Sequence, residues 1–404
     1  MTIPNGNILT GLKNRLPNLM NWPTVTWHPT RLDRAILGAV LALSLVGIVA
    51  VYSATAYLAA SSETTTEGLL FEHVIRLALA LGAMVVFSQL DYHVVARLSK
   101  LGIITSVILL VWVLVQGNWQ GGAKRAIFGF RPSDIARFAL IVHVAVLLTR
   151  KQLYIHHFVR GFMPVMLWGV VITILIGAQN VSTALVLLLT ILVMGFVGRM
   201  KLVHLGGLLG LGLSLALVML LLFPARAERV ESYLGIHLFT HTDERSVFDE
   251  RGELFQILQA QIAVANGGLT GKGTGKSTQK DWIPSAYSDF IFVIVAEEYG
   301  MLGALFILTM LGIILYRGFM HIARNAPDPL GFFLAMGITL SIGLYGLVHV
   351  CVNIGLMPVT GLPFPFVSWG GTSLIITGMM LGVLLNIAGQ RFAPGKRAPK
   401  TKST

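Results

Sequence analysis

Charged residues are scarce in this sequence. Only 12% of its 404 residues are Asp, Glu, Lys or Arg, whereas 55% are hydrophobic, and the mean hydropathy is +0.76. A soluble globular domain carries about 25% charged residues, so this composition excludes that class. The sequence instead predicts an all-α polytopic membrane protein.

Cysteine and acidic residues are also few. Cys351 is the only cysteine and lies in an apolar run, which excludes an internal disulfide and suggests no thiolate metal cluster. Asp and Glu number 18 against 30 Lys and Arg, so the formal net charge is +12. In a soluble protein this excess would suggest nucleic acid. Here the basic residues lie mostly in short loops between apolar runs, so membrane topology explains them and no nucleic-acid partner is expected.

Long apolar runs recur along the whole chain. Crossing about 30 Å of hydrocarbon takes about 17 to 25 helical residues. No repeat of about 20 to 50 residues is visible, and the two halves lack matched interrupted helices, which disfavours an inverted-repeat carrier. The runs predict ten transmembrane helices, at residues 35–60, 72–90, 99–117, 134–149, 162–179, 181–198, 202–223, 286–316, 331–354 and 369–390.

The distribution of Lys and Arg predicts the orientation of these helices. Ten spans place both termini on one side, and the loops on that side hold most of the basic residues. Because short cytoplasmic loops accumulate Lys and Arg, both termini are predicted to be cytoplasmic. The predicted parts are an N-terminal tail at 1–34, a membrane domain at 35–390 with a large extracytoplasmic loop at 224–288 between helices seven and eight, and a basic C-terminal tail at 391–404.

Residues 267–300 contain glycine, lysine, hydroxyl and carboxylate groups beside an apolar run. Asp289 follows the loop WIPSAYS and precedes FIFVIVA, so its carboxylate is expected at the outer membrane boundary, where it could act in chemistry or only cap a helix. Glu297 and Glu298 are expected deeper. At least one of them must face protein or a water-filled cavity, because a charge in hydrocarbon is costly.

The segment GKGTGKSTQK at residues 271–280 approaches the nucleotide-binding P-loop pattern without matching it. The first glycine of that pattern is replaced by Thr270, no strand precedes the segment, and the loop is expected outside the cytoplasm. Glycine backbone and lysine ammonium groups still suit an anion such as pyrophosphate, whereas a solvated loop is the alternative. The candidate anion-binding residues are Lys276, Ser277, Gln279 and Lys280.

A second candidate anion site is the loop GGAKRAIFGFRPSD, which carries Lys124, Arg125 and Arg131. Anchoring at the membrane interface is the alternative for these residues. Asp134 and Arg137 follow at a spacing of three on one helix face, so an ion pair between them is geometrically allowed. That pair would either fix the helix end or contact substrate.

An uncharged loop at residues 355–371, GLMPVTGLPFPFVSWGG, could partly re-enter the membrane. Ser368 would be among the polar groups nearest a ligand there, or it would cap the helix that follows.

Four motifs recur together in one known family: GAKRAIFGFRPSDIAR, QNVSTALV, QAQIAVANGGLTGKGTGKSTQK with IPSAYSDFIFVIVAEEYG, and GLPFPFVSWGGTSL. With the expected spans they resemble the SEDS family (shape, elongation, division and sporulation) of membrane peptidoglycan glycosyltransferases. The resemblance covers almost the whole chain, and the N-terminal extension and GKGTGKSTQK form resemble division members more than elongation members. Four positions depart from the family pattern: Asp134 and Arg137 stand where a Glu and a Lys are common, Asn180 stands where many members have Asp, and Trp369 replaces a more usual Tyr.

The resemblance implies a polymerase of peptidoglycan glycan strands that uses lipid II, with inverting glycosyl transfer and undecaprenyl diphosphate as leaving group, in septal cell-wall synthesis. It implies that Asp289 is the catalytic carboxylate, with Asp134, Arg137, Glu297 and Ser368 in supporting roles. One base and several cations suffice for this reaction, whereas a glycosidase needs two carboxylates at a defined separation. A lipid II flippase or transporter, or an elongation polymerase, is the alternative.

The implied surroundings are the bacterial plasma (inner) membrane at the division septum. The implied partners are lipid II, the polyprenyl-diphosphate glycan strand, a class B penicillin-binding protein, other divisome membrane proteins and the lipid bilayer. No cofactor is certain. A divalent cation, Mg or Mn, would help to neutralise the diphosphate, although the sequence shows no recognisable set of metal ligands.

Overall fold

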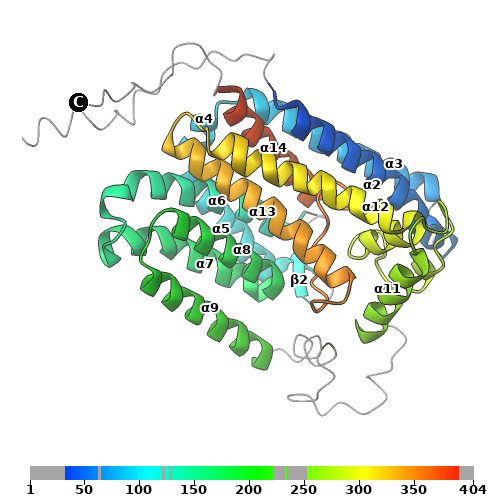
Figure 1. Ribbon diagram of the computed structural model, residues 1–404. Coiled ribbons are helices and arrows are strands. Elements are labelled where there is room, and N and C mark those ends of the chain that lie inside the picture. Colours follow the sequence, from blue (N-terminus) through cyan, green and yellow to red (C-terminus); the bar gives the residue numbers. More distant parts are fainter. Residues whose placement is uncertain are drawn as a thin grey trace, which may run out of the picture.

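The computed structural model describes residues 32–61, 65–120, 123–126, 130–222, 233 and 253–390. Within this part the chain is a bundle of long helices (Figure 1). In the described residues 9 helices are long and apolar enough to cross a membrane, and α8 (Val181–Val197) is apolar but only 17 residues long. The prediction of an all-α polytopic membrane protein is confirmed at this level.

The remaining elements follow in chain order. The helices are α2 (Arg34–Ser61), α3 (Thr66–Gln89), α4 (Tyr92–Arg97), α5 (Ser99–Gln116), α6 (Pro132–Lys151), α7 (Met163–Gln179), α9 (Leu202–Leu222), α11 (Glu253–Gly267), α12 (Ile291–Tyr316), α13 (Pro329–Asn353) and α14 (Thr372–Gln390). Short 3-10 and π helices lie beside them at η2 (Gln152–Tyr154), η3 (Phe158–Phe162), η4 (Gln279–Asp281) and η5 (Arg317–Ala323).

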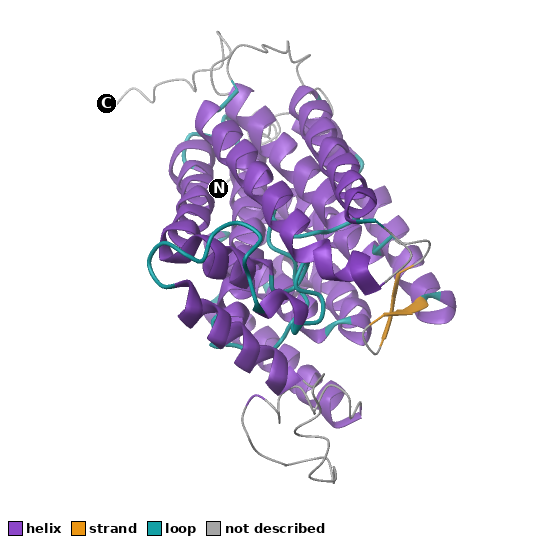
Figure 2. Ribbon diagram, turned by 90° about the vertical axis from the view of Figure 1, so that its right-hand side faces the viewer, coloured by secondary structure: helices purple, strands orange, loops and turns teal. Residues whose placement is uncertain are grey.

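One small sheet was not predicted from the sequence. The strands β1 (Asn118–Gln120) and β2 (Ala123–Ala126) pair antiparallel, with Trp119 opposite Lys124 and an irregularity next to Asn118. Figure 2 shows this hairpin in orange at the side of the helical bundle. It lies between α5 and α6, where periodicity had indicated only a loop.

Polar residues set the starts of several helices. Thr65 accepts a hydrogen bond from the Gly68 N–H at the start of α3, and Asp328 accepts one from Gly331 at the start of α13. Asn180 separates α7 from α8, and its side-chain oxygen accepts from the N–H groups of Ser182 and Thr183. Each side chain satisfies a backbone donor that has no partner within its helix.

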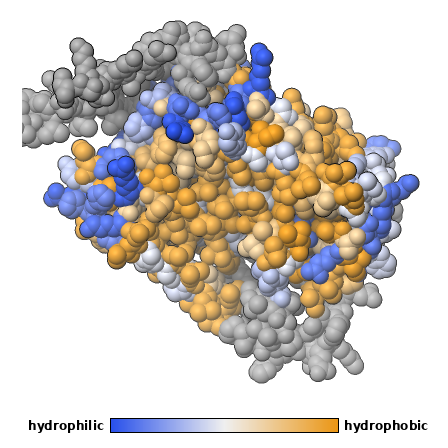
Figure 3. Space-filling model, in the orientation of Figure 1, coloured by the Kyte–Doolittle hydropathy of each residue, from blue (hydrophilic) through white to orange (hydrophobic). Residues whose placement is uncertain are grey.

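The interior of the bundle is formed mainly by α6, α13 and α14, whereas α9 lies at the edge with little of its surface covered (Figure 1). Hydrophobic side chains cover the broad middle of the face shown in Figure 3, and hydrophilic ones gather at its margins. A wide exposed apolar surface of this kind is expected where protein meets lipid.

Several predicted segments lie outside the residues that the structure describes, and one predicted helix boundary differs from the observed one. Most of the tail at 1–34, the whole tail at 391–404 and much of the loop at 224–288 lie outside the described residues. The described end of that loop contains the helix α11. The eighth span begins at Ile291 rather than at residue 286, because the preceding residues form turns.

Candidate active site

Asp289 lies in the turns between η4 and α12. Its N–H donates to the carbonyl of Ser285 at 3.0 Å, and the Ser288 hydroxyl donates to Asp289 Oδ1 at 3.0 Å. The N-cap residue of α12 is Phe290, without a side-chain cap, so the alternative role of Asp289 as a helix cap is not observed. Its side chain is half-buried.

Asn353, at the last position of α13, fixes the backbone around Asp289. Its amide nitrogen donates to the carbonyl of Asp289 at 2.9 Å and to that of His349 at 2.9 Å, and its oxygen accepts the Val293 N–H at 3.2 Å. Asn353 is fully buried. Asn353 was not among the predicted site residues; its signal in the sequence is an amide at the end of an apolar run.

The uncharged loop after α13 packs against the same turns. The Ser368 hydroxyl donates to the carbonyl of Ser288 at 2.7 Å, and the Trp369 N–H donates to the carbonyl of Tyr287 at 2.9 Å. Ser368 therefore bridges two loops and does not cap α14. Burial and the negative charge of Asp289 raise the pKa of the Tyr287 phenol.

Gly361 brings this loop next to the carboxylate. A Cβ atom at Gly361 would lie 3.6 Å from Asp289 Oδ2, and the backbone there has a φ of +66°. Glycine adopts this conformation without strain. The absence of a side chain leaves room beside the carboxylate.

Glu297 is fully buried in α12 and collects the polar groups of the glycine-lysine segment. Lys272 Nζ lies 2.7 Å from its Oε1, the Thr278 hydroxyl donates to the same oxygen at 2.9 Å, and Ser277 and the Gln279 N–H bind the second oxygen. The structure thus places Ser277 and Gln279 on Glu297, where they stabilise a buried carboxylate. Their contact with a substrate anion stays a prediction.

The other two lysines of the segment remain on its surface. Lys280 Nζ donates to the carbonyl of Gly275 at 2.8 Å, and the Lys276 side chain is exposed. Within the described ranges neither lysine has a carboxylate at ion-pair distance. Both ammonium groups are therefore available to an anion.

Asp134 and Arg137, predicted to pair with each other, use separate partners. The Thr372 hydroxyl donates to Asp134 Oδ2 at 2.9 Å and accepts the Arg131 N–H at 3.2 Å. The Arg137 guanidinium lies 3.9 Å from the centroid of the Tyr345 ring. Arg137 also donates to the Thr377 hydroxyl at 3.4 Å. Both α6 side chains are buried, and in the described part of the chain they form no ion pair with each other.

The predicted cations Lys124 and Arg125 belong to β2, and their side chains lie outside the described part of the structure. The loop before α14 and the first residue of α14 connect Asp134 to the Asp289 turns: Ser368 donates to the Ser288 carbonyl and Thr372 donates to Asp134. Among the described residues no group of His, Cys, Asp and Glu could hold a metal ion. The divalent cation therefore stays a prediction.

Comparison with known proteins gives consistent matches over the whole bundle. The profile of the FtsW/RodA/SpoVE family of cell cycle proteins matches residues 33–392. Stage V sporulation protein E of Bacillus subtilis (strain 168) is 34% identical over 377 residues, which cover 90% of this chain and 99% of that protein. A protein of Geobacter sulfurreducens named "probable peptidoglycan glycosyltransferase FtsW" is 33% identical over 368 residues, covering 89% and 95% of the two chains.

Solved structures share the fold. The crystal structure of the Thermus thermophilus rod shape determining protein RodA aligns with a TM-score of 0.66 at 24% identity, and covers 90% of this chain and 99% of its own. A chain of a peptidoglycan synthase complex that coordinates polymerization and crosslinking aligns with a TM-score of 0.70, with the same identity and coverage. The family profile and the two sequence relatives show that the chain belongs to the FtsW/RodA/SpoVE, or SEDS, family, as its motifs predict.

Proposed function

We propose that the protein is a peptidoglycan glycosyltransferase that polymerises glycan strands from lipid II in septal cell-wall synthesis. Relatives named as peptidoglycan glycosyltransferases FtsW support this function. The observation that carries it is the partly buried carboxylate of Asp289: Ser288 donates to it, Asn353 holds the Asp289 backbone carbonyl, and the preceding segment carries the exposed Lys276.

In the proposed reaction, Asp289 accepts the proton of a sugar hydroxyl as its oxygen bonds to the anomeric carbon of a second sugar. The bond from that carbon to the diphosphate oxygen breaks on the opposite face, and undecaprenyl diphosphate leaves with the electron pair. The configuration at the anomeric carbon is inverted. A positioned base of this kind contributes about 10²- to 10⁴-fold to the rate. Lys276 and Lys280 would offset the negative charge of the leaving group.

The proposed site faces the outer side of the membrane. The Lys and Arg distribution supports cytoplasmic tails at 1–34 and 391–404 and an extracytoplasmic loop at 224–288. We place the protein in the bacterial plasma (inner) membrane at the division septum. As partners we propose a class B penicillin-binding protein, which would crosslink the strands, and other divisome membrane proteins; the similar chain in a peptidoglycan synthase complex that coordinates polymerization and crosslinking supports the first.

The test is polymerisation of lipid II by the purified full-length protein in liposomes. Asp289→Asn keeps the side-chain shape and removes the base, so the amount of glycan polymer is expected to fall at least about 10²-fold. Asp281→Asn, which changes an exposed carboxylate of η4, is the matched control and should retain the wild-type rate. Wild-type polymerisation by Asp289→Asn, together with loss of lipid II movement across the bilayer, would establish a flippase instead.

A further inference from the structure

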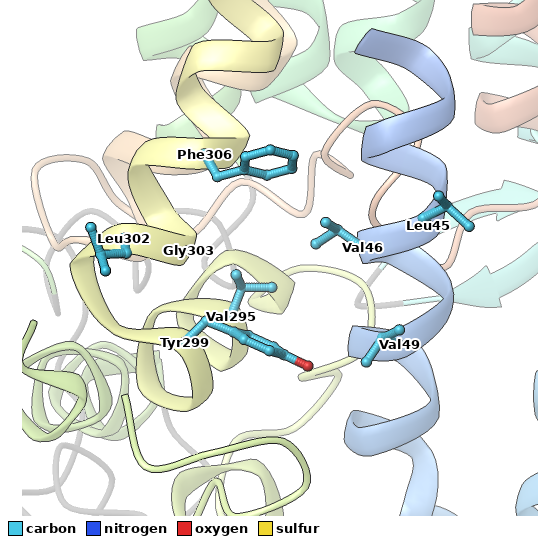
Figure 4. A pocket seen from close by; sticks show the side chains of 8 residues that line it. All are labelled: Leu45, Val46, Val49, Val295, Tyr299, Leu302, Gly303 and Phe306. Carbon is cyan, nitrogen blue, oxygen red and sulfur yellow. The ribbon is translucent and has the colours of Figure 1, made fainter. Parts of the chain in front are cut away.

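A groove of about 430 Å³ lies between α2 and α12, separate from the Asp289 turns. Figure 4 shows its side chains extending from both helices toward a shared space. Gly303 contributes no side chain to its wall, and the break in α12 at Gly300 lies beside it. Its apolar lining consists of Leu45, Val46, Val49, Val295, Leu302 and Phe306.

The groove has one polar residue, Tyr299, whose hydroxyl points toward the α2 side of the space in Figure 4. That hydroxyl lies 3.0 Å from the Thr274 hydroxyl of the glycine-lysine segment. The Lys276 side chain folds over Gly273, since its Nζ is 4.0 Å from the position that a Gly273 Cβ would take. The segment that contacts the polar residue of the groove therefore carries a hydroxyl and an ammonium group.

This order of groups fits an amphiphile with a hydrocarbon chain and an anionic head. The groove opens on the lipid-facing surface, where Leu45 is 65% and Leu302 57% exposed, so hydrocarbon is its natural content. A volume of this size is typical of a ligand pocket. The cation at one end favours phosphate oxygens over a neutral head group. The segment that carries it continues into the turns of Asp289.

We propose that the groove between α2 and α12 binds the isoprenoid chain of a polyprenyl diphosphate, with the diphosphate at Thr274 and Lys276. This inference rests on the proposed function and gives a place to its leaving group. Along the chain, residues 274–289 connect the polar end of the groove to the Asp289 turns.

The test uses a polyprenyl diphosphate with a photoreactive group in its isoprenoid chain, added to the full-length protein in liposomes and mapped by mass spectrometry. Label is expected on peptides of α2 and α12, and excess undecaprenyl diphosphate should displace it. Val49→Trp fills the groove and should remove most of the label. Leu305→Trp, on the lipid-facing surface of α12 but outside the lining, is the matched control and should keep it.

Lys276→Ala tests the head group. Loss of one charge-assisted contact should weaken labelling by the diphosphate about tenfold, while labelling by an uncharged polyprenol probe stays unchanged. Label confined to other helices, indifference to Val49→Trp, or equal displacement by phosphatidylglycerol would each overturn the proposal. Labelling is measured in Asp289→Asn as well as in the wild type, so that binding is observed without turnover. If the wild-type protein is labelled in the groove but does not polymerise lipid II, only the proposed reaction is contradicted.

Discussion

The position of the Asp289 carboxylate depends on a residue 64 positions away in sequence. Asn353 uses its amide to hold the carbonyl of Asp289 and its oxygen to hold the Val293 N–H, so the turn before α12 and its first helical turn are fixed together. A displacement of about 1 Å at a reacting group can cost about 10²-fold in rate. Asn353 is thus a positioning residue for Asp289.

Asn353→Ala is expected to lower the polymerisation rate about 10²-fold, because the Asp289 turn loses its anchor. It should also cost about 1–3 kcal/mol of stability, since the hydrogen bonds of the buried Asn353 amide to the Asp289 carbonyl, the His349 carbonyl and the Val293 N–H are lost. Asn386→Ala is the matched control: this buried amide accepts the Tyr92 N–H at 3.1 Å and donates to the Ser88 carbonyl at 2.9 Å, at the other end of the bundle.

Thermal unfolding and lipid II polymerisation, both measured on the two purified variants, separate the effects. Similar losses of stability with a rate defect only in Asn353→Ala support positioning. If the two variants show the same rate per folded molecule, the Asn353 contacts serve stability alone.

The sequence allowed Asp289 to be singled out, because an acidic residue between a proline-containing turn and an apolar run is unusual. It did not allow the roles of Ser277 and Asn353 to be found. Ser277 donates to the carboxylate of Glu297, which is 20 residues away in sequence. Without the position of that carboxylate, a hydroxyl beside lysines resembles an anion-binding site. Long-range contacts of this kind leave no local pattern.

At the scale of elements, the glycine-lysine segment completes α12. Gly300 has a φ of +65° and interrupts the helix, which leaves backbone groups without helical partners. The glycine-lysine segment supplies the missing hydrogen-bond partners. The Lys272 N–H donates to the Glu297 carbonyl at 3.0 Å, and the Met301 N–H donates to the Gly268 carbonyl at 2.9 Å. The glycines suited an anion-binding loop in sequence, and in the structure Gly267 and Gly271 also pack closely against the backbone of α12.

Two glycines of this segment give a matched pair. Gly271 and Gly275 both have positive φ, of 82° and 77°, so alanine at either position is expected to cost about 1–2 kcal/mol in the backbone. A Cβ at Gly271 would lie 2.2 Å from the carbonyl oxygen of Glu298, whereas a Cβ at Gly275 meets nothing within 4 Å.

Gly271→Ala should therefore lose about 1–3 kcal/mol more than Gly275→Ala, because the segment has to move off the helix break. The midpoint of thermal unfolding of the purified variants measures this difference. Equal midpoints would mean that the segment does not depend on close contact with α12.

At the scale of the whole molecule, hydropathy predicted where the spans lie but not how they pack. Leu43 and Leu45 belong to one apolar run, yet the first is fully buried and the second is 65% exposed. In lipid an apolar side chain is favourable in either place, so its identity does not indicate which face of a helix meets protein. The arrangement of α3, α13 and α14 around the site therefore had no signal in composition.

Polar clusters hold the two ends of this arrangement. Asn353 acts at the end of α13, and a cluster around His93 acts at its start. Asp91 Oδ1 lies 2.8 Å from His93 Nδ1, and Asp328 Oδ2 lies 2.7 Å from His93 Nε2. Both ring nitrogens can donate only when the imidazole is cationic. Gln390 at the end of α14 donates to Asp91, so the cluster ties α4, α13 and α14 together.

This cluster predicts a pH dependence of stability. Burial lowers the pKa of His93, but its hydrogen bonds to Asp328 and Asp91 outweigh this, so that the pKa is raised from its usual 6.5. Burial raises the pKa of the Asp91 and Asp328 carboxyls, but hydrogen bonds, chiefly from His93, lower it further, so that each pKa lies below its usual 3.8. The stability that His93 contributes to the folded state is therefore complete below pH 6.5 and is lost as the pH rises through the raised pKa. The stability that the two carboxylates contribute is complete above pH 3.8 and is lost as the pH falls through their lowered pKa values.

His93→Gln removes the titrating group and leaves a polar side chain of similar length. The difference in unfolding midpoint between wild type and His93→Gln should be largest between about pH 4 and about pH 6.5, and should shrink as the pH is raised toward about 9. His156→Gln, at an exposed histidine, is the control and should follow wild type throughout. A difference that stays constant over this range would mean that His93 is not held as a cation, and that hydrogen bonds of a neutral ring join these three helices.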